Sequence, residues 1–451
     1  MAPLHPRRTH ARAGSACVLA ALLAAGCAGP RGTQPPPAPG PTGGAPPTRP
    51  APQPAPQTSA WRYPQSVRIG LVVGAGRFKI AGSRDWRLRL LDGREITKGD
   101  PGARLEVVRD GAGAIDVFRE GEPAPVWSGG IGDTLELIPE MGGFSGWSGN
   151  WYRGTFRVHA SNPAGLTLVN EVGFDDYLRS VLPNEIGTPP ESDFAAVQAQ
   201  AVAARSYTAA YLGRRAALGF DLYASVEDQV YAGKTRENAQ SDRAVQSTRG
   251  EVLISDGVPI RALYSSACGG RTANVEDVWP WDWTAYLRSV RDDAGPETPA
   301  YCERSANFRW REEWDADAFL AMLRQYGPPE NPAAASLSGE LLDVRVDRRS
   351  RCGRVQDLSV TTTSGDAVFH GDRTRWALRR PGTAAILRSS FFKIGILRGE
   401  DGRPVKVVAT GAGNGHGIGM CQWGAMGMAR AGVDYREILH HYYKSTRLDR
   451  L

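Results

Sequence analysis

The sequence predicts an α+β fold, in which a β-rich part precedes a mixed region built around one alanine-rich helix. Apolar and polar residues alternate in short runs over 67–169, as in half-buried strands, and Gly, Asp and Pro separate these runs. Residues 192–213 are rich in alanine and place larger apolar residues at helical spacing. We therefore expect a β-rich N-terminal domain over 61–170 and a mixed α/β region over 171–451.

The helices have recognisable ends. Ser192 is the expected N-cap of the alanine-rich helix, and Gly213 is expected to end it. A further helix is expected over 316–325, with strands on both sides. Asp434 and Glu437 form a capping-box pattern before the last helix.

Composition and charge exclude some classes of protein. The 451 residues suffice for two or three domains, and a hydrophobic content of 41% fits a soluble globular protein rather than a membrane bundle. The formal net charge is +6, but the basic residues are scattered and form no stripe with interleaved aromatics. We therefore expect no nucleic-acid partner.

The first 27 residues have the pattern of an export signal. Three arginines precede an apolar stretch of about 14 residues, which is too short to cross a bilayer of about 30 Å as a helix. The following LAAGC resembles a bacterial lipobox, with Cys27 as the lipidated residue. We expect an exported lipoprotein, periplasmic or on the cell surface, that contacts the membrane through this lipid anchor. The alternative is a plain secretory signal in which Cys27 is incidental.

Residues 28–60 form a Pro-rich linker with almost no apolar side chain to bury. Such a composition predicts an extended, semi-rigid spacer. A spacer of this kind suits an anchored protein that reaches away from its membrane.

Four cysteines remain outside the signal and the lipobox: Cys268, Cys302, Cys352 and Cys421. In an oxidising compartment they are expected to form disulfides, for which three pairings exist, and free thiols are the alternative. The chain has no CxxC and no Cys/His spacing typical of zinc. We therefore expect no metal and no cofactor.

Glu185 is the main catalytic candidate. It lies in the stretch SVLPNEIGTPP, where prolines on both sides restrict the backbone and hold the carboxylate at a fixed position, which we expect to be a loop. Its apolar neighbours Leu182 and Ile186 could raise its pKa, as a general acid at neutral pH requires. The alternative is an ordinary surface carboxylate near a helix N-terminus, which the local chemistry alone favours.

Three other motifs carry polar or aromatic groups that could bind a ligand. His416 lies among glycines in GNGHGIG, where it could donate a hydrogen bond to a ligand or tie the turn to the core. Ser266 and Cys268 lie beside a Gly-Gly turn; a Ser/His hydrolase is conceivable, but no nucleophile elbow is present. The tryptophans of VWPWDWTAYL could stack on sugars or fill the core.

Together these motifs resemble the SpoIID/LytB family, the stage II sporulation protein D type of peptidoglycan lytic transglycosylase. The resemblance runs in the family's order from about residue 66 to the C-terminus. It rests above all on NEVGFDDYLRSVLPNEIG, AVQAQAVAARSYTAAY, DQVYAG, SSACGGRT and GHGIGMCQWGAMGMA.

The resemblance implies that 171–451 is the catalytic region, which cuts MurNAc–GlcNAc bonds of peptide-stripped glycan strands and leaves 1,6-anhydroMurNAc ends. Such an enzyme uses one acid/base, here Glu185, because the sugar's own C6 hydroxyl replaces the water for which ordinary glycosidases need a second carboxylate. The positions implied to line the groove or support it are Arg205, Tyr207, Ser266, Gly269, His416 and Gln422.

Departures from the family pattern bear on metals and disulfides. Some members carry Cys and His zinc ligands just before QVY; this chain has neither in LGFDLYASVEDQVYAG, which implies that it has no zinc there. Cys352 and Cys421 stand where small or polar residues are expected, so the comparison implies that they pair with each other. Cys268 and Cys302 would then form the second bridge.

Two other functions are compatible with the sequence. As in the LytB branch, the chain could bind glycan without cutting it and modulate a cell-wall amidase, which would be its partner. The third possibility is a structural envelope protein.

Overall fold

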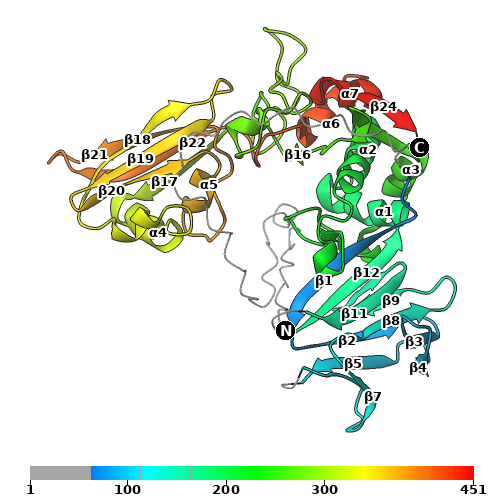
Figure 1. The fold of residues 1–451 in the computed structure, drawn as a ribbon. Coiled ribbons are helices and arrows are strands. Elements are labelled where there is room, and N and C mark those ends of the chain that lie inside the picture. The colour runs from blue at the N-terminus through cyan, green and yellow to red at the C-terminus, as the bar shows by residue number, and fades with distance from the viewer. Residues whose placement is uncertain (1–61, 111–112, 162–164, 451) are drawn as a thin grey trace, which may run out of the picture. The chain divides into compact units, whose positions relative to one another are not determined.

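The computed structural model describes residues 62–110, 113–161 and 165–450, and the α+β fold is confirmed there (Figure 1). The expected signal over 1–27, the lipidation site Cys27 and the linker over 28–60 lie outside these residues. Within the described part, no helix combines the length and apolar character needed to span a membrane.

Two mainly antiparallel sheets form the N-terminal part. The first contains, in spatial order, β13 (Leu222–Tyr223), β1 (Ser66–Ala75), β12 (Leu166–Gly173), β11 (Thr155–Ala160), β8 (Thr134–Pro139), β3 (Trp86–Leu90) and β4 (Glu95–Gly99). The second contains β10 (Asn150–Tyr152), β9 (Ser145–Trp147), β2 (Arg77–Gly82), β5 (Arg104–Arg109), β6 (Ile115–Arg119) and β7 (Pro125–Gly129). Alternate residues such as Leu105 and Val107 are wholly buried, which confirms the predicted half-buried strands.

Helix α1 (Phe174–Glu185) follows β12 directly, and the expectation that Glu185 lies in a loop is wrong. Glu185 is the last residue of the helix, which continues through Pro183. Val181 and Leu182 are wholly buried, so packing of this last turn outweighs the tendency of proline to end a helix.

The alanine-rich helix is α2 (Phe194–Ala210). Its N-cap is Asp193 rather than Ser192, and its C-cap is Tyr211, two residues before Gly213. Asp193 is wholly buried and forms an ion pair with Arg430, at 2.6 Å. This ion pair between the buried Asp193 and the half-buried Arg430 fixes the start of α2 against the C-terminal part of the chain.

Other elements pack around α2, whose small side chains allow close approach (Figure 1). They are α1, α3 (Ala239–Ser247), α6 (Gln422–Arg430), α7 (Tyr435–Tyr442) and β14 (Glu251–Ser255). Strand β14 lies between β15 (Val258–Pro259) and β24 (Arg447–Arg450). As predicted, Asp434 caps α7, where it accepts hydrogen bonds from two backbone N–H groups.

A short pair of parallel strands connects the SSACGG motif with the GHGIG motif. Strand β16 (Tyr264–Ser265) pairs with β23 (Met420–Cys421), so that Tyr264 lies opposite Met420. The stretch before SSACGG and the stretch after GHGIG therefore run side by side.

Between these motifs, the stretch from Trp310 to Gly411 forms a hydrophobic core of its own. One sheet contains, in spatial order, β17 (Trp310–Asp315), β22 (Pro404–Gly411) and β21 (Phe392–Arg398). The other contains β18 (Leu341–Arg349), β19 (Val355–Thr362) and β20 (Gly365–His370). The helices of this stretch include α4 (Ala316–Tyr326) and α5 (Arg373–Ala377). The helix expected over 316–325 is confirmed as α4. The buried residues of 171–451, which was expected to be one region, therefore belong to two clusters.

Candidate functional site

The carboxyl group of Glu185 is half-buried at the C-terminal end of α1. The backbone N–H of Val230 donates a hydrogen bond to Glu185 Oε1, at 2.9 Å. Burial raises the pKa of Glu185 to about 7, and this hydrogen bond opposes the shift only in part, because it favours the charged form. At neutral pH the group can therefore both give and take a proton.

The segment that holds Glu185 is fixed by the buried amide of Gln229. Its Nε2 donates to Thr208 Oγ1 of α2, at 2.7 Å, and its Oε1 accepts from the hydroxyl of Tyr264 in β16, at 2.9 Å. The next residue, Val230, carries the N–H that meets Glu185. Neither Gln229, in the DQVYAG motif, nor Tyr264 was among the residues predicted from the sequence.

His416 joins the same neighbourhood through Tyr264. Its Nδ1 accepts a hydrogen bond from the N–H of Ile418 at 3.0 Å, so its Nε2 carries the proton and donates to the carbonyl of Tyr264 at 2.9 Å. Burial lowers the pKa of His416 to about 4, so the ring is neutral at neutral pH. Burial, and next the charge of Glu185, raise the pKa of the Tyr264 hydroxyl, which places Tyr264 near both candidate residues.

An aromatic row extends from His416. The ring of Trp279 lies 4.9 Å from that of His416 and 5.2 Å from that of Trp281, measured between centroids. The guanidinium of Arg261 lies over Trp281 at 4.5 Å. Trp283, two residues on, is 67% exposed. The loop thus offers aromatic surface to solvent as well as filling the core.

Three of the positions that the resemblance implied lie inside the protein. Arg205 is 0% exposed; its guanidinium donates to the carbonyls of Val245 and Glu251 and pairs with Asp175. Tyr207 is buried, and Gln422 is buried with its amide 3.3 Å from Gln200. These side chains support the site rather than line a groove.

Ser266 and Gly269 contribute mainly through the backbone. Ser266 is half-buried, and its carbonyl accepts a hydrogen bond from the N–H of Trp423, at 3.0 Å. Gly269 has φ +79°, and a Cβ there would lie 2.7 Å from the Cβ of Ala412. Only glycine fits this close approach without strain. Among the predicted residues, the structure therefore brings Glu185 and His416 together through Tyr264.

The expected disulfides are absent, because all four cysteines of the described chain are free. Cys352 contacts Ser350 in the turn between β18 and β19, whereas Cys421 lies beside Cys268 at the start of α6, so the pairing of Cys352 with Cys421 is wrong. Cys268 and Cys302 do meet, but their sulfurs are 3.7 Å apart, well beyond a bond of about 2.05 Å.

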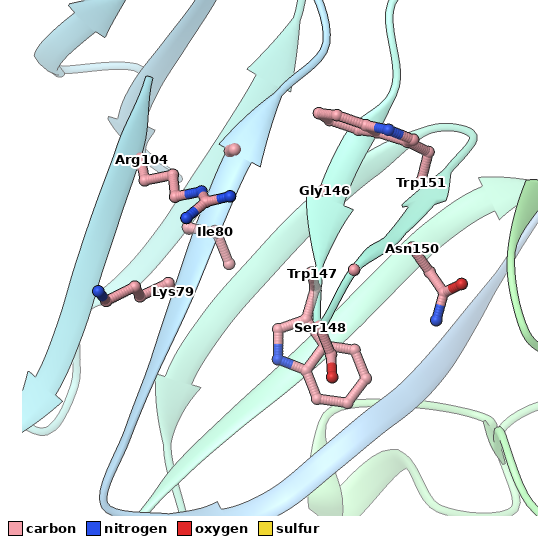
Figure 2. Close-up of a pocket in the computed structure, with 10 residues that line it drawn as sticks. Lys79, Ile80, Arg104, Gly146, Trp147, Ser148, Asn150 and Trp151 are labelled. Carbon is pink, nitrogen blue, oxygen red and sulfur yellow. The ribbon is translucent and has the colours of Figure 1, made fainter. Parts of the chain in front are cut away.

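A separate cavity of about 400 Å³ lies on the second N-terminal sheet (Figure 2). Figure 2 shows Lys79 and Arg104 on one side of it and the indoles of Trp147 and Trp151 on the other. None of the residues that line it belongs to the group around Glu185.

We expect the variant Glu185→Gln to be more stable than the wild type at pH 8, by up to about 3 kcal/mol. The pKa of Glu185 is raised on folding from 4.5 to about 7, so between these values the folded state binds more protons and loses stability as pH rises. Gln removes this dependence. Thermal unfolding across pH 5–8 should show the gain shrinking towards pH 5; a gain that does not depend on pH would contradict the raised pKa. The exposed Glu191, changed to Gln, is the control.

Comparison with known proteins finds two family matches. Residues 162–254 match the SpoIID family, described as stage II sporulation protein, and residues 297–419 match a domain of unknown function, DUF8618. The second match includes the whole of the separate core between Trp310 and Gly411.

Relatives extend the similarity beyond that family match. An uncharacterized protein of Brachyspira hyodysenteriae is 31% identical over 62% of this chain and 67% of its own length. The stage II sporulation protein D of Bacillus subtilis is 25% identical, over 62% of this chain and 75% of its own. The amidase enhancer of Bacillus subtilis is 28% identical over 60% of this chain but 40% of its own. The chain belongs to the SpoIID/LytB family.

Proposed function

We propose that this protein is a peptidoglycan lytic transglycosylase, with Glu185 as its single acid and base. The observation that carries the proposal is the half-buried Glu185 carboxyl, whose pKa is about 7 and which the Val230 N–H holds in place. A group with this pKa is partly protonated at neutral pH, as acid catalysis requires, and is a usable base once it has lost its proton.

In this reaction Glu185 gives up one proton and takes one back. The protonated carboxyl gives its proton to the glycosidic oxygen as the bond from C1 of MurNAc to that oxygen breaks. The resulting carboxylate takes the proton of the C6 hydroxyl, while O6 bonds to C1 and closes the 1,6-anhydro ring. Val230 N–H stabilises the intermediate carboxylate at Oε1 and leaves Oε2 to carry the proton.

The aromatic row beside His416 suits a glycan strand. Trp279, Trp281 and the exposed Trp283 offer faces on which sugars stack, and the neutral His416 holds the first of them. The family resemblance favours strands already stripped of their peptides. A lipid anchor at Cys27 and the Pro-rich spacer over 28–60 would hold the exported enzyme within reach of the cell wall.

Product analysis tests the proposal. Purified protein is incubated with intact and with peptide-stripped peptidoglycan, and the released ends are identified by mass spectrometry. We expect 1,6-anhydroMurNAc ends, mainly from stripped strands. Reducing ends would instead identify a hydrolase and contradict the proposed mechanism.

The similarity to an amidase enhancer favours one other function, a glycan-binding modulator whose partner is a cell-wall amidase. The same assay separates the two. Binding to glycan without any product, together with a faster reaction of an added amidase, would support the modulator and overturn the transglycosylase.

Glycan affinity is expected to depend on the aromatic row. Replacing Trp281 with Ala removes its contacts with Trp279 and Arg261, and we expect binding of stripped strands to weaken about tenfold, or roughly 1.4 kcal/mol. Co-sedimentation with insoluble glycan measures this. The partly exposed Trp376 of α5, changed to Ala, is the matched control. Equal losses in both variants would show that the row makes no specific contact.

A further inference from the structure

Four side chains of metal-ligating type meet in the main hydrophobic core, close to but outside the candidate site. They are Cys268, Asp292, Cys302 and Cys421, and all are buried. Their ligand atoms lie within 4.8 Å of one another. They come from three segments of the chain: the Gly-Gly turn after β16, the stretch before β17, and the start of α6. We propose that they bind one Zn²⁺ in a closed, structural site.

The spacing of the sulfurs fits zinc. Two thiolates on a tetrahedral zinc, each bonded at about 2.3 Å, lie about 3.8 Å apart. The sulfurs of Cys268 and Cys302 are 3.7 Å apart. Two thiols in simple contact would also show this distance, so the assignment needs the charges and partners around the cluster.

Neighbouring N–H and O–H groups donate hydrogen bonds to two of the proposed ligands, Cys421 and Asp292. The N–H groups of Cys268 and Gly424 donate to the sulfur of Cys421, at 3.2 and 3.3 Å. Asp292 accepts from the hydroxyl of Tyr442 at 2.5 Å and from the N–H of Cys302 at 3.1 Å. Outer-shell bonds of this kind orient metal ligands.

A nearby buried cation balances the charge of such a site. Three thiolates and a carboxylate around Zn²⁺ leave two negative charges in excess, and burying them without compensation is costly. The guanidinium of Arg354 is almost wholly buried and donates to the carbonyl of Cys268, at 3.2 Å. Its Nε and Nη1 have no hydrogen-bond partner in the described protein. A buried cation so poorly partnered fits beside an anionic metal centre.

The number of cysteines favours a metal over a disulfide. A bond between any two of Cys268, Cys302 and Cys421 would leave a third buried thiol against it, whereas zinc uses all three. Three soft thiolate sulfurs outnumber the single hard carboxylate oxygen, and such a set selects zinc over calcium or magnesium. This proposal departs from the expectation, drawn from the sequence, that the chain holds no metal, because these four ligands are widely spaced along the chain and form no zinc motif.

The site would brace the residues around Glu185 without taking part in the chemistry. Cys421 lies in β23, which pairs with β16, and Tyr264 of β16 contacts both His416 and Gln229. Zinc would therefore clamp the strand pair on which these contacts depend.

Metal analysis of the full chain tests the inference. Protein purified from cells grown with added zinc should hold one zinc per chain by elemental analysis. Cys302→Ser and Asp292→Asn should weaken zinc binding by more than the roughly 10- to 100-fold that loss of an outer-shell partner costs. Cys352→Ser, the fourth cysteine and the matched control, should keep one zinc. Exchange for Co²⁺ should give a thiolate–cobalt absorption band that only the cluster variants lose.

Intact mass without reductant gives the opposing outcome. Metal-free protein with a disulfide between Cys268 and Cys302 would overturn the inference, as would zinc that both cluster variants retain. Should Cys302→Ser fail to fold, the nearly isosteric Asp292→Asn and the number of zinc ions per wild-type chain still test the inference. None of these measurements depends on activity, so the zinc site and the proposed transglycosylase can fail separately.

Discussion

Glu185→Gln is expected to lower the rate of 1,6-anhydro product formation by about 10²- to 10⁴-fold, the range typical for loss of a general acid–base group. Gln keeps the shape of the side chain and can accept the Val230 hydrogen bond, but it has no proton to transfer. Binding of stripped strands should therefore stay unchanged while kcat falls. Timed digests analysed by mass spectrometry measure the rate.

The pH profile of the wild type adds a second readout. Since the reaction begins with protonated Glu185, kcat/KM should fall as pH rises through about 7. Glu191→Gln, an exposed carboxylate six residues away, should keep the wild-type rate and profile. Residual activity of the Glu185 variant within a few-fold of the wild type would remove Glu185 from the mechanism.

Arg205→Ala is expected to cost about 3–5 kcal/mol of unfolding free energy, the cost of breaking a buried, hydrogen-bonded charge pair. The guanidinium bonds to Tyr63, Thr248 and two backbone carbonyls and lies 3.5 Å from Asp175. Its loss would leave these buried acceptors without a donor. Urea unfolding measures the change.

The exposed Arg243 provides the control, because its ion pair with Glu191 lies at the surface and should contribute less than about 1 kcal/mol. Arg205→Lys keeps the charge but loses the fork of donors, so we expect an intermediate loss of stability. If that variant is as stable as the wild type yet fails to bind glycan, Arg205 contacts substrate and the structural role is wrong.

Local patterns predicted the regular elements well. Alternation located the strands that became β1, β3, β5 and β12, and helical spacing located α2 to within three residues at each end. These patterns succeed because burial of one face decides the structure of a short segment. The cap of α2 moved from Ser192 to Asp193 because Asp193 pairs with Arg430, far away in the sequence.

Features that depend on distant contacts were not predictable. The helix continues to Glu185 because the core buries Val181 and Leu182. Gln229 holds the Glu185 segment, but an uncharged amide inside DQVYAG looks like any other polar residue. The disulfide expectation failed for the same reason, since the distances among four cysteines spread over 268–421 are set by the fold alone.

The pairing of β17 with β22 has a consequence for how this chain can change. Trp310 lies directly opposite Gly411, and the indole crosses the glycine where any Cβ would clash. The chain therefore leaves the main core and returns to it at neighbouring points, as inserted domains commonly do. Changes of length are therefore expected in the outer loops of this stretch, whereas Arg354, which donates to the carbonyl of Cys268, ties the stretch to the main core.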